Sequence, residues 1–526
     1  RHGAIQGMIR IGDADAVFAF AQSKSPAVRR AVVLALRRFK DARIGKLLND
    51  SDLSIAVEAV QRVLDADLTR RRPGPPLARR LAAVLSGLPD DVAGVLGTGV
   101  LMPLSKAMAA NGEINKAYPD ELLSIEGYTK GKIKTGDIID SKNVEFVKDL
   151  LEPVRYEQIL KQGRKLKVGK TTSEIMKLSP WEYIEATVKN AGKAAFDAKG
   201  NVVNKADGKP WIGGNPFPDP KNGLELFAAQ TLNWGRHDAS FYAMKLYAMD
   251  PGGDARFNYQ GGWCEYSPVA RVSMEPMPYV TDQMTKLRFQ SVFFTSPQEQ
   301  AGASFLVPWY YDQRKFPEIY GYLPQFRRVR QFPANQRFEP LVPGITLFLS
   351  DAWAAGDPMR TWGNTKIVGR EPHLAALGGN FRGEEHPNWE NHKRHGGAKG
   401  ETFMDYTMEL VPECVVIESE PTGYPRAPVG KKKIWVDVRN AMVIAYITYD
   451  RRGAIWKQVD PAFGPQVQGK FVNKDETGHP NWSWTSVHIH DIQSNRMSLL
   501  NHVKQISGGY SSSYHADDEN AIYEKF

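Results

Sequence analysis

Histidines gather in two parts of the sequence where they could bind a metal ion. His386, His392 and His395 stand in a Gly- and Asn-rich stretch, and His488 and His490 would share one face of a strand. Imidazole nitrogens are common Zn²⁺ ligands, so either set could support metal-assisted chemistry. Neither set has a standard ligand spacing, and polar residues are expected in such loops. We therefore predict no tightly bound metal and no other cofactor.

Residues 234–240 bring His, Asp and Ser together in sequence, but a catalytic triad is defined by its geometry in space. The chain lacks a nucleophile elbow, a phosphate-binding loop and a dinucleotide fingerprint. It also has neither zinc-finger spacing nor the aromatic and basic strand signature of nucleic-acid binding. The sequence therefore favours a binding protein over an enzyme and excludes nucleic acid as the expected partner.

Residues 320–330 combine arginines with aromatic side chains. In one extended strand Arg328 and Arg330 would share a face, and Arg327 would point the other way. Guanidinium groups fix carboxylates and phosphates by paired hydrogen bonds. We expect these three arginines to contact an anion, which is either a ligand headgroup or an acidic partner. The alternative is that they pair with carboxylates of the same chain, such as Glu318 or Glu339.

Large flat side chains are plentiful, with 12 Trp, 20 Tyr and 23 Phe. In residues 442–447 both faces of the expected strand are apolar, whereas a sheet with one wet face alternates apolar and polar residues. Both faces must then be hidden, either under helices or around an apolar cavity. The residues that we expect to line such a cavity are Trp309, Tyr310, Tyr322, Phe326, Met442, Ile444, Tyr446, Tyr449 and Trp456.

Short β-branched and aromatic runs alternate with turn residues from about residue 195 onward, which predicts antiparallel hairpins. Helix starts are expected at Ser141 and Ser179, in a stretch that mixes helix and loop. The pattern predicts an α+β fold dominated by a large antiparallel sheet. The clearest strands are Lys286–Ser296, Val411–Glu420, Lys433–Val438, Met442–Asp450 and Ala454–Val459.

Residues 1–90 have apolar residues at helical spacing, at Ser25–Leu36 and again at Leu53–Val60, with a shorter helix expected over Asp41–Leu48. This pattern resembles short HEAT-type repeats, and a plain helical bundle is the alternative. The segment Arg72–Pro76 breaks helix and marks a joint.

The apolar stretch Val92–Leu104 follows Arg79 and Arg80 and precedes small residues, as in a secretory signal peptide. The alternative is a helix that runs into a linker. A chain of 526 residues is too long for one typical domain. We therefore divide it into a helical segment (1–90), a linker or signal-like segment (91–117) and a β domain with N-terminal helices (118–526).

The remaining composition sets few limits on function. The net charge of +9 favours an acidic partner only mildly. Two cysteines, Cys264 and Cys414, allow one disulfide without requiring it. No apolar run reaches the length of a transmembrane helix.

Four segments, taken in order, resemble the bacterial family known as domain of unknown function 1329: Phe326–Arg330, Gln336–Phe338, Lys366–Arg370 and Tyr449–Lys457. The resemblance covers about residues 118–526. It implies a periplasmic protein with a fold similar to the lipoprotein carriers and receptors of the Lol system. That fold is a strongly curved antiparallel sheet, an incomplete barrel, closed by helices over an apolar cavity. The resemblance supplies no catalytic residues.

The resemblance also implies partners, namely a transporter of the resistance-nodulation-division type and an outer-membrane barrel protein. It does not account for the first hundred residues, which are either a fusion or a region upstream of the real start. We expect a periplasmic carrier for a hydrophobic or amphiphilic, lipid-like molecule. The alternatives are an envelope enzyme acting on such a molecule, with or without a metal at the histidines, and a structural subunit of an envelope complex.

Overall fold

A computed structural model describes residues 13–39, 41, 43, 47, 118–351, 357–475, 478–507 and 509–510. The chain divides into two compact units, Arg1–Ser105 and Lys106–Phe526, and each is described by itself. Within the described ranges, no helix is both long enough and apolar enough to cross a membrane.

The first unit contains the helices α2 (Ala14–Phe18) and α3 (Pro26–Arg38), with a 3-10 turn, η1 (Ala19–Gln22), between them. Val17, Val32 and Leu36 are buried in their shared core. Helix α3 begins where the sequence predicts it. No finding supports the HEAT-type repeat, because its second unit lies outside the described residues. So do the joint at 72–76, the signal-like stretch at 92–104 and most of the helix expected over 41–48.

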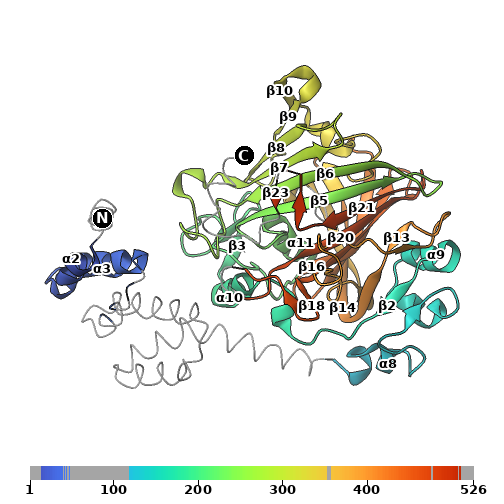
Figure 1. The fold of residues 1–526 in the computed structure, drawn as a ribbon, viewed down its shortest axis with the longest axis horizontal. Helices are drawn as coiled ribbons and strands as arrows, with labels where there is room; N and C mark the ends of the chain where they lie inside the picture. The colour runs from blue at the N-terminus through green and yellow to red at the C-terminus, as the bar shows by residue number, and fades with distance from the viewer. Residues whose placement is uncertain are drawn as a thin grey trace. The chain divides into compact units, whose positions relative to one another are not determined.

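The second unit is built around one open sheet of 15 strands (Figure 1). Neighbouring strands are antiparallel except β2 and β14, which are parallel. The architecture confirms the predicted α+β class with a large antiparallel sheet. In spatial order the strands are β1 (Ile138–Ile139), β2 (Leu166–Val168), β14 (Tyr406–Glu420), β15 (Val429–Asp437), β16 (Met442–Asp450), β17 (Ile455–Pro465), β20 (Trp482–Asp491), β21 (Arg496–His502), β5 (Ala239–Met249), β6 (Ala255–Tyr266), β7 (Lys286–Ser296), β8 (Ser304–Tyr310), β9 (Ile319–Leu323) and β10 (Arg328–Phe332), and β11 (Gly363–Ala375) also pairs with β14.

Helices and small hairpins surround this sheet. The α-helices are α8 (Ile125–Tyr128), α9 (Pro153–Gln162), α10 (Trp181–Asn190) and α11 (Gly223–Leu232). The 3-10 helices are η4 (Asp120–Leu122), η5 (Val144–Leu150), η6 (Ile175–Lys177), η7 (Thr281–Gln283), η8 (Pro324–Phe326), η9 (Ala334–Phe338), η10 (Leu349–Asp351) and η11 (Met359–Thr361). Short strands pair as β3 (Ala194–Phe196) with β4 (Val202–Asn204), β12 (Arg394–His395) with β13 (Phe403–Met404), β18 (Val467–Gln468) with β19 (Phe471–Val472), and β22 (Gln505–Ile506) with β23 (Gly509–Tyr510).

Two sequence expectations about local structure need correction. The helix expected from Ser141 is present as the 3-10 helix η5 but begins only at Val144, because Asn143 accepts a hydrogen bond from the backbone of Asp140 and so stabilises a turn before it. The arginine segment is a hairpin of β9 and β10 instead of one strand. Pro324 opens η8 between the two strands, and Arg327 has a positive φ of 49°.

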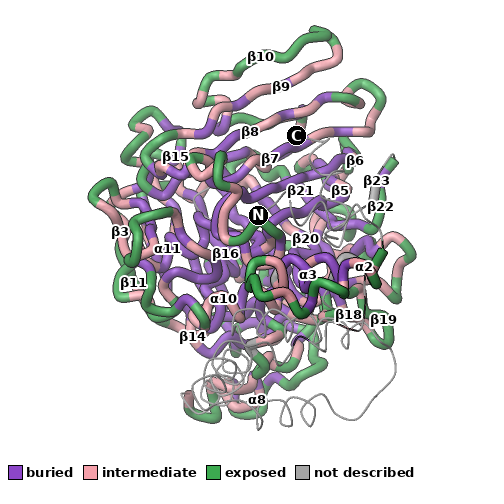
Figure 2. Tube along the Cα trace, turned by 90° about the vertical axis from the view of Figure 1, so that its left-hand side faces the viewer, coloured by how far each residue is buried: buried purple, intermediate pink, exposed green. Residues whose placement is uncertain are grey.

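The central strands are covered on both faces, and Figure 2 shows β5, β16 and β20 as mainly buried. Helix α11 packs on one face, and eight of its ten residues are buried, as expected for a helix that is apolar all round. Asn222 caps its start by accepting a hydrogen bond from the Glu225 backbone. Helix α9 and η5 cover the opposite face, where Ile159 and Leu150 share a core with Leu499 of β21. Both faces are therefore hidden, as the apolar pattern of residues 442–447 predicts.

Candidate ligand-binding cavity and its surroundings

An apolar cavity lies between α11 and the face of the central strands that this helix covers. The volume that the centre of a water molecule can occupy inside this cavity is about 80 Å³. That space exceeds the roughly 10–15 Å³ that one water needs. The walls come from α11 and the loop after it, from six strands, and from η10 with the segment before it. The lining residues are Gln230, Trp234, Met244, Trp263, Leu347, Asp351, Met442, Val443, Tyr446, Val459, Pro461, Phe463, Trp484, Val487, Ile489 and Leu500.

One polar part of the wall is built around Glu265, which is buried behind two lining tryptophans. The indole N–H of Trp234 donates to both carboxylate oxygens of Glu265, at 2.9 and 2.8 Å. The indole N–H of Trp263 donates to one of them at 2.9 Å. Burial raises the pKa of Glu265 to about 7, although the charge of Arg288 and the Trp263 hydrogen bond act to lower it. This acid therefore titrates near neutral pH.

A second polar part of the wall is Asp351, whose charge is already balanced. The ammonium group of Lys457 donates to Asp351 Oδ2 at 2.7 Å, and the Phe348 backbone N–H donates to the same oxygen at 3.1 Å. The hydroxyl of Tyr446 donates to the Asp351 carbonyl. Nearby, burial lowers the pKa of Lys432 to about 8, and its ammonium group donates to the Ser350 carbonyl at 2.7 Å. These contacts make the Asp351 side a closed hydrogen-bonded wall.

Two of the nine residues expected to line a cavity, Met442 and Tyr446, lie in this wall. Trp309 and Ile444 are buried in the same core without reaching the cavity. The exposed side chain among the nine is Phe326. The half-buried ones, also outside the wall, are Tyr310, Tyr322, Tyr449 and Trp456.

The sequence reasoning missed Gln230, Trp234, Trp263 and Trp484, which come from separate elements. A signal for Gln230 was present, because it is a polar residue directly after the apolar run of residues 226–229. The alternation in β20 also marks Trp484, which stands between the small polar residues of that strand.

The arginine hairpin, β9 with β10 and the turn between them, lies at the edge of the sheet (Figure 1). Arg327, Arg328 and Arg330 are exposed, and the guanidinium of Arg330 lies 3.9 Å from the centre of the Phe326 ring. Phe326 and Val329 are also exposed, at 44% and 64%. Within the described ranges, no ion pair joins these arginines to a carboxylate.

The acids suggested by sequence as partners of these arginines bind elsewhere. Glu318 accepts the hydroxyl of Tyr320 at 3.0 Å, and Glu339 accepts the side-chain amide of Gln336 at 3.0 Å. The hairpin therefore presents cationic and apolar groups together to solvent.

The two sets of histidines approach each other at Phe403, whose ring centre lies 6.3 Å from that of His395 and 6.2 Å from that of His488. His386 and His392 have ring centres 4.9 Å apart. Nε2 of His395 accepts the Lys165 backbone N–H, and its Nδ1 faces Asp405 at 2.8 Å. In the second set, Nε2 of His488 accepts the Met404 backbone N–H at 2.9 Å.

The one group of three potential metal ligands among the described residues contains none of these histidines. It consists of Glu182, Asp475 and His479, whose ligand atoms lie within 4.8 Å of one another. The His479 ring stacks on Trp181 at 4.1 Å between centres. The two cysteines are free and buried, so Cys264 and Cys414 are not bonded to each other.

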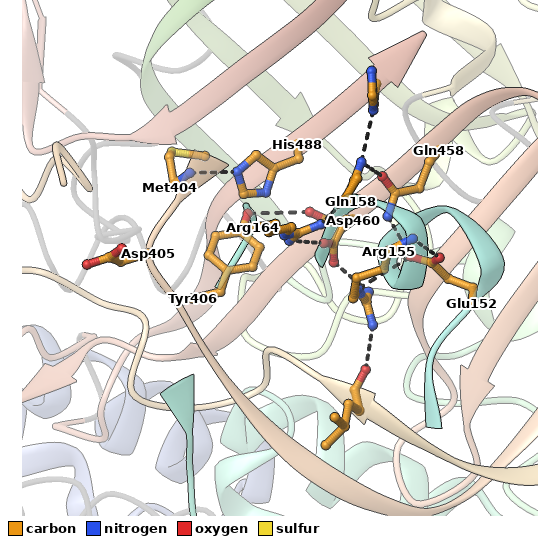
Figure 3. A network of polar contacts seen from close by, with 12 residues as sticks. Glu152, Arg155, Gln158, Arg164, Met404, Asp405, Tyr406, Gln458, Asp460 and His488 are labelled. Carbon is orange, nitrogen blue, oxygen red and sulfur yellow. Dashed lines mark hydrogen bonds and ion pairs between the residues drawn. The ribbon is translucent and has the colours of Figure 1, made fainter. Parts of the chain in front are cut away.

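A buried polar network fills the opposite face of the sheet, under α9 (Figure 3). Asp460 of β17 pairs with both Arg155 and Arg164, and all three side chains are fully buried. Burial acts to raise the pKa of Asp460, but the charges of the two arginines outweigh it and lower the pKa to about 2. Gln158 donates to Gln458 Oε1 at 2.9 Å. The network therefore clamps α9 to the sheet.

The fold and cavity define a class of protein, an open antiparallel sheet whose central strands enclose an apolar cavity under a buried helix. The sequence matches the family described as protein of unknown function (DUF1329) over residues 138–525, and the chain belongs to that family. A comparison with curated proteins finds no significant match.

Solved structures of other proteins match this chain at low similarity. A putative outer membrane lipoprotein-sorting protein domain from Vibrio parahaemolyticus is 15% identical, with a TM-score of 0.36 over 58% of this chain and 98% of that one. A DUF1329 family protein from Desulfovibrio piger is 12% identical, with a TM-score of 0.36 over 57% of this chain and 97% of that one. The LolA superfamily protein NE2245 from Nitrosomonas europaea is 12% identical, with a TM-score of 0.31 over 54% and 91%.

Proposed function

We propose that this protein binds and carries a hydrophobic or amphiphilic, lipid-like molecule in the cavity under α11. The observation that carries this proposal is an apolar space inside a domain whose sheet is otherwise packed on both faces. Native interiors are close-packed, so a cavity of this kind is a feature that a ligand explains well.

The chemistry of the wall supports binding over catalysis. Among the lining residues that the structure describes, Asp351 is the charged side chain, and Lys457 already neutralises it. The wall presents indoles, a phenol, an amide and aliphatic groups, without a serine, cysteine or histidine to act as nucleophile or base. These surfaces suit the retention of an apolar molecule.

We further propose that the protein works in the bacterial periplasm, with a transporter of the resistance-nodulation-division type and an outer-membrane protein. Membership of the DUF1329 family supports this proposal through the resemblance stated above. Fractionation of the source cell, followed by co-purification from cross-linked envelopes, tests both parts. Recovery in the cytoplasmic fraction would contradict the localisation.

The test of the binding function is mass spectrometry of an organic extract of the purified protein, compared with a cavity-filling variant. Leu500 lines the cavity, and its neighbour Leu499 points into the opposite core. We expect the wild type to release a lipid-like molecule at near-stoichiometric yield and Leu500→Trp to release much less, because the indole occupies the ligand space.

Leu499→Ala is the matched control for loss of stability. It removes buried methyl groups from the other face and should lower stability by roughly 2–5 kcal/mol while leaving the ligand yield unchanged. Equal ligand yields from folded wild type and folded Leu500→Trp would contradict the proposal. A wild-type protein that neither releases an apolar molecule nor binds one that is added would also contradict it.

A further inference from the structure

Resting on the proposed carrier function, we infer that the ligand bears a neutral acyl carbonyl, as in an ester, which accepts hydrogen bonds from Gln230 and Trp484 inside the cavity. Both side chains line the cavity. The inference names the chemical class of the ligand and places its polar group in the interior, away from the arginine hairpin.

Gln230 is a buried amide in helix α11, whose residues 226–229 are all apolar. Its side chain is 4% exposed, and Nε2 has no hydrogen-bond partner in the described part of the chain. An unpaired buried donor destabilises the folded protein, and most buried polar groups in native proteins are paired. Because Gln230 is a lining residue of the cavity, a ligand acceptor that reaches this amide would pair it.

Trp484 supplies a second donor of the same kind. Its side chain is 6% exposed, and its indole N–H has no partner among the described residues. The ring is held in place by a stack with His502 at 5.1 Å and an edge contact with Tyr242 at 5.8 Å between centres. A fixed ring cannot readily turn its N–H toward another acceptor, so this donor is also available to a ligand.

The acceptors of the wall are, in contrast, already used. Glu265 accepts the indoles of Trp234 and Trp263, and Asp351 accepts Lys457 and the Phe348 backbone. A ligand whose polar group only donates would find no free partner in these two carboxylates. A ligand with an acceptor oxygen would pair donors that are otherwise unpaired.

The charge near this part of the wall favours a neutral acceptor over a carboxylate. Tyr242, which contacts Trp484, is close enough to Glu265 for the acid's charge to act on its hydroxyl. An anionic headgroup next to Trp484 would therefore meet a second negative charge in a buried setting, where repulsion is weakly screened. An ester or similar carbonyl provides the acceptor without that repulsion.

The test compares three probes of similar size on the full chain after removal of bound lipid: undecane, methyl decanoate and decanoic acid. Affinities are measured by displacement of an apolar fluorescent dye at pH 8. We expect methyl decanoate to bind roughly tenfold more tightly than undecane, because each hydrogen bond contributes about 0.5–1.5 kcal/mol. Decanoic acid should bind more weakly than the ester.

Gln230→Leu and Trp484→Phe should each lower the affinity for methyl decanoate about two- to tenfold and leave the affinity for undecane unchanged. Gln290→Leu is the matched control, because Gln290 Nε2 is also buried and unpaired but lies outside the wall. That change should leave the ratio of the ester and alkane affinities unaltered.

Equal affinity of the wild type for ester and alkane would overturn this inference and leave the carrier function standing. The inference would also be overturned, with the carrier function left standing, if Gln230→Leu and Trp484→Phe did not reduce the ratio of the ester affinity to the alkane affinity. Tighter binding of decanoic acid than of the ester would mean that the ligand bears an anionic headgroup instead of a neutral carbonyl, which would overturn the inference. If none of the three probes binds, the carrier function fails together with the inference.

Discussion

Glu265 is a single residue whose ionisation connects the cavity wall to the stability of the whole domain. Its pKa rises from 4.5 to about 7 on folding because the carboxyl group is buried. Between these two pH values the unfolded chain has released a proton that the folded chain still holds. By linkage, the contribution of Glu265 to the free energy of unfolding falls as the pH rises through this interval and becomes flat above it.

Glu265→Gln should therefore remove this part of the pH dependence. We expect the difference in unfolding free energy between wild type and variant to change by up to about 3 kcal/mol from pH 4.5 to pH 7, with the wild type losing stability relative to the variant. The measurement is urea unfolding at a series of pH values. Only the difference isolates Glu265, since burial lowers the pKa of His488 and His502 and so acts in the opposite direction. A difference that is constant with pH would show that Glu265 does not titrate in this range.

We still predict that the histidines considered as metal ligands bind no metal ion tightly. Ring nitrogens of His395 and His488 already bind backbone N–H groups. The measurement is elemental analysis after purification without added metal. We expect no stoichiometric zinc that depends on these histidines, so His488→Ala and His392→Ala should not remove any. Zinc that is instead lost on His479→Ala would move the site to the group of Glu182 and Asp475.

At the scale of elements, the clamp between α9 and the sheet depends on Asp460. Asp460→Asn leaves Arg155 and Arg164 buried without their shared counter-charge, so we expect a loss of about 3–5 kcal/mol. The control is Asp312→Asn, which removes a partly exposed pair with Arg314 and should cost less than about 1 kcal/mol. Urea unfolding at pH 7 measures both. Similar small losses would mean that the network contributes little to holding α9.

The arginine hairpin is predicted to contact an anionic surface. The double change Arg328→Ala and Arg330→Ala should weaken sedimentation with vesicles rich in phosphatidylglycerol several-fold, with an unchanged melting temperature, because both side chains are exposed. Arg451→Ala with Arg452→Ala in the β16–β17 turn is the matched control and should have little effect. A lowered melting temperature with vesicle binding intact would assign a structural role to the hairpin arginines.

The sequence predicts the strands better than the cavity, for a physical reason. Alternation and turn residues are local signals, and β7 and β16 have the predicted bounds. The cavity wall combines Gln230, Trp263 and Trp484, which are brought together by tertiary packing that no local pattern records. The expected aromatics around Tyr310 and Tyr322 are instead near the edge of the sheet, because strand order is a non-local property.

At the scale of the whole molecule, the two compact units differ in what they contain. The unit Lys106–Phe526 holds the 15-stranded sheet, the cavity and the α9 clamp. The described helices of the other unit have a separate small core. Every residue proposed to contact the ligand therefore belongs to the second unit.

Limited proteolysis of the full chain should consequently release a stable fragment that begins before about residue 118. The sequence predicts the first cuts at 72–76, where Pro and Gly exclude a regular element, or in the segment that follows, and this region lies outside the described residues. Mass spectrometry would locate the cuts, and thermal melting would compare the fragment with the intact protein. We expect the same melting temperature for the β domain and the same extractable ligand, because the sheet, both of its cores and the cavity remain whole. A fragment that is degraded further, or that loses its ligand, would show instead that the first unit is needed to complete the fold of the second.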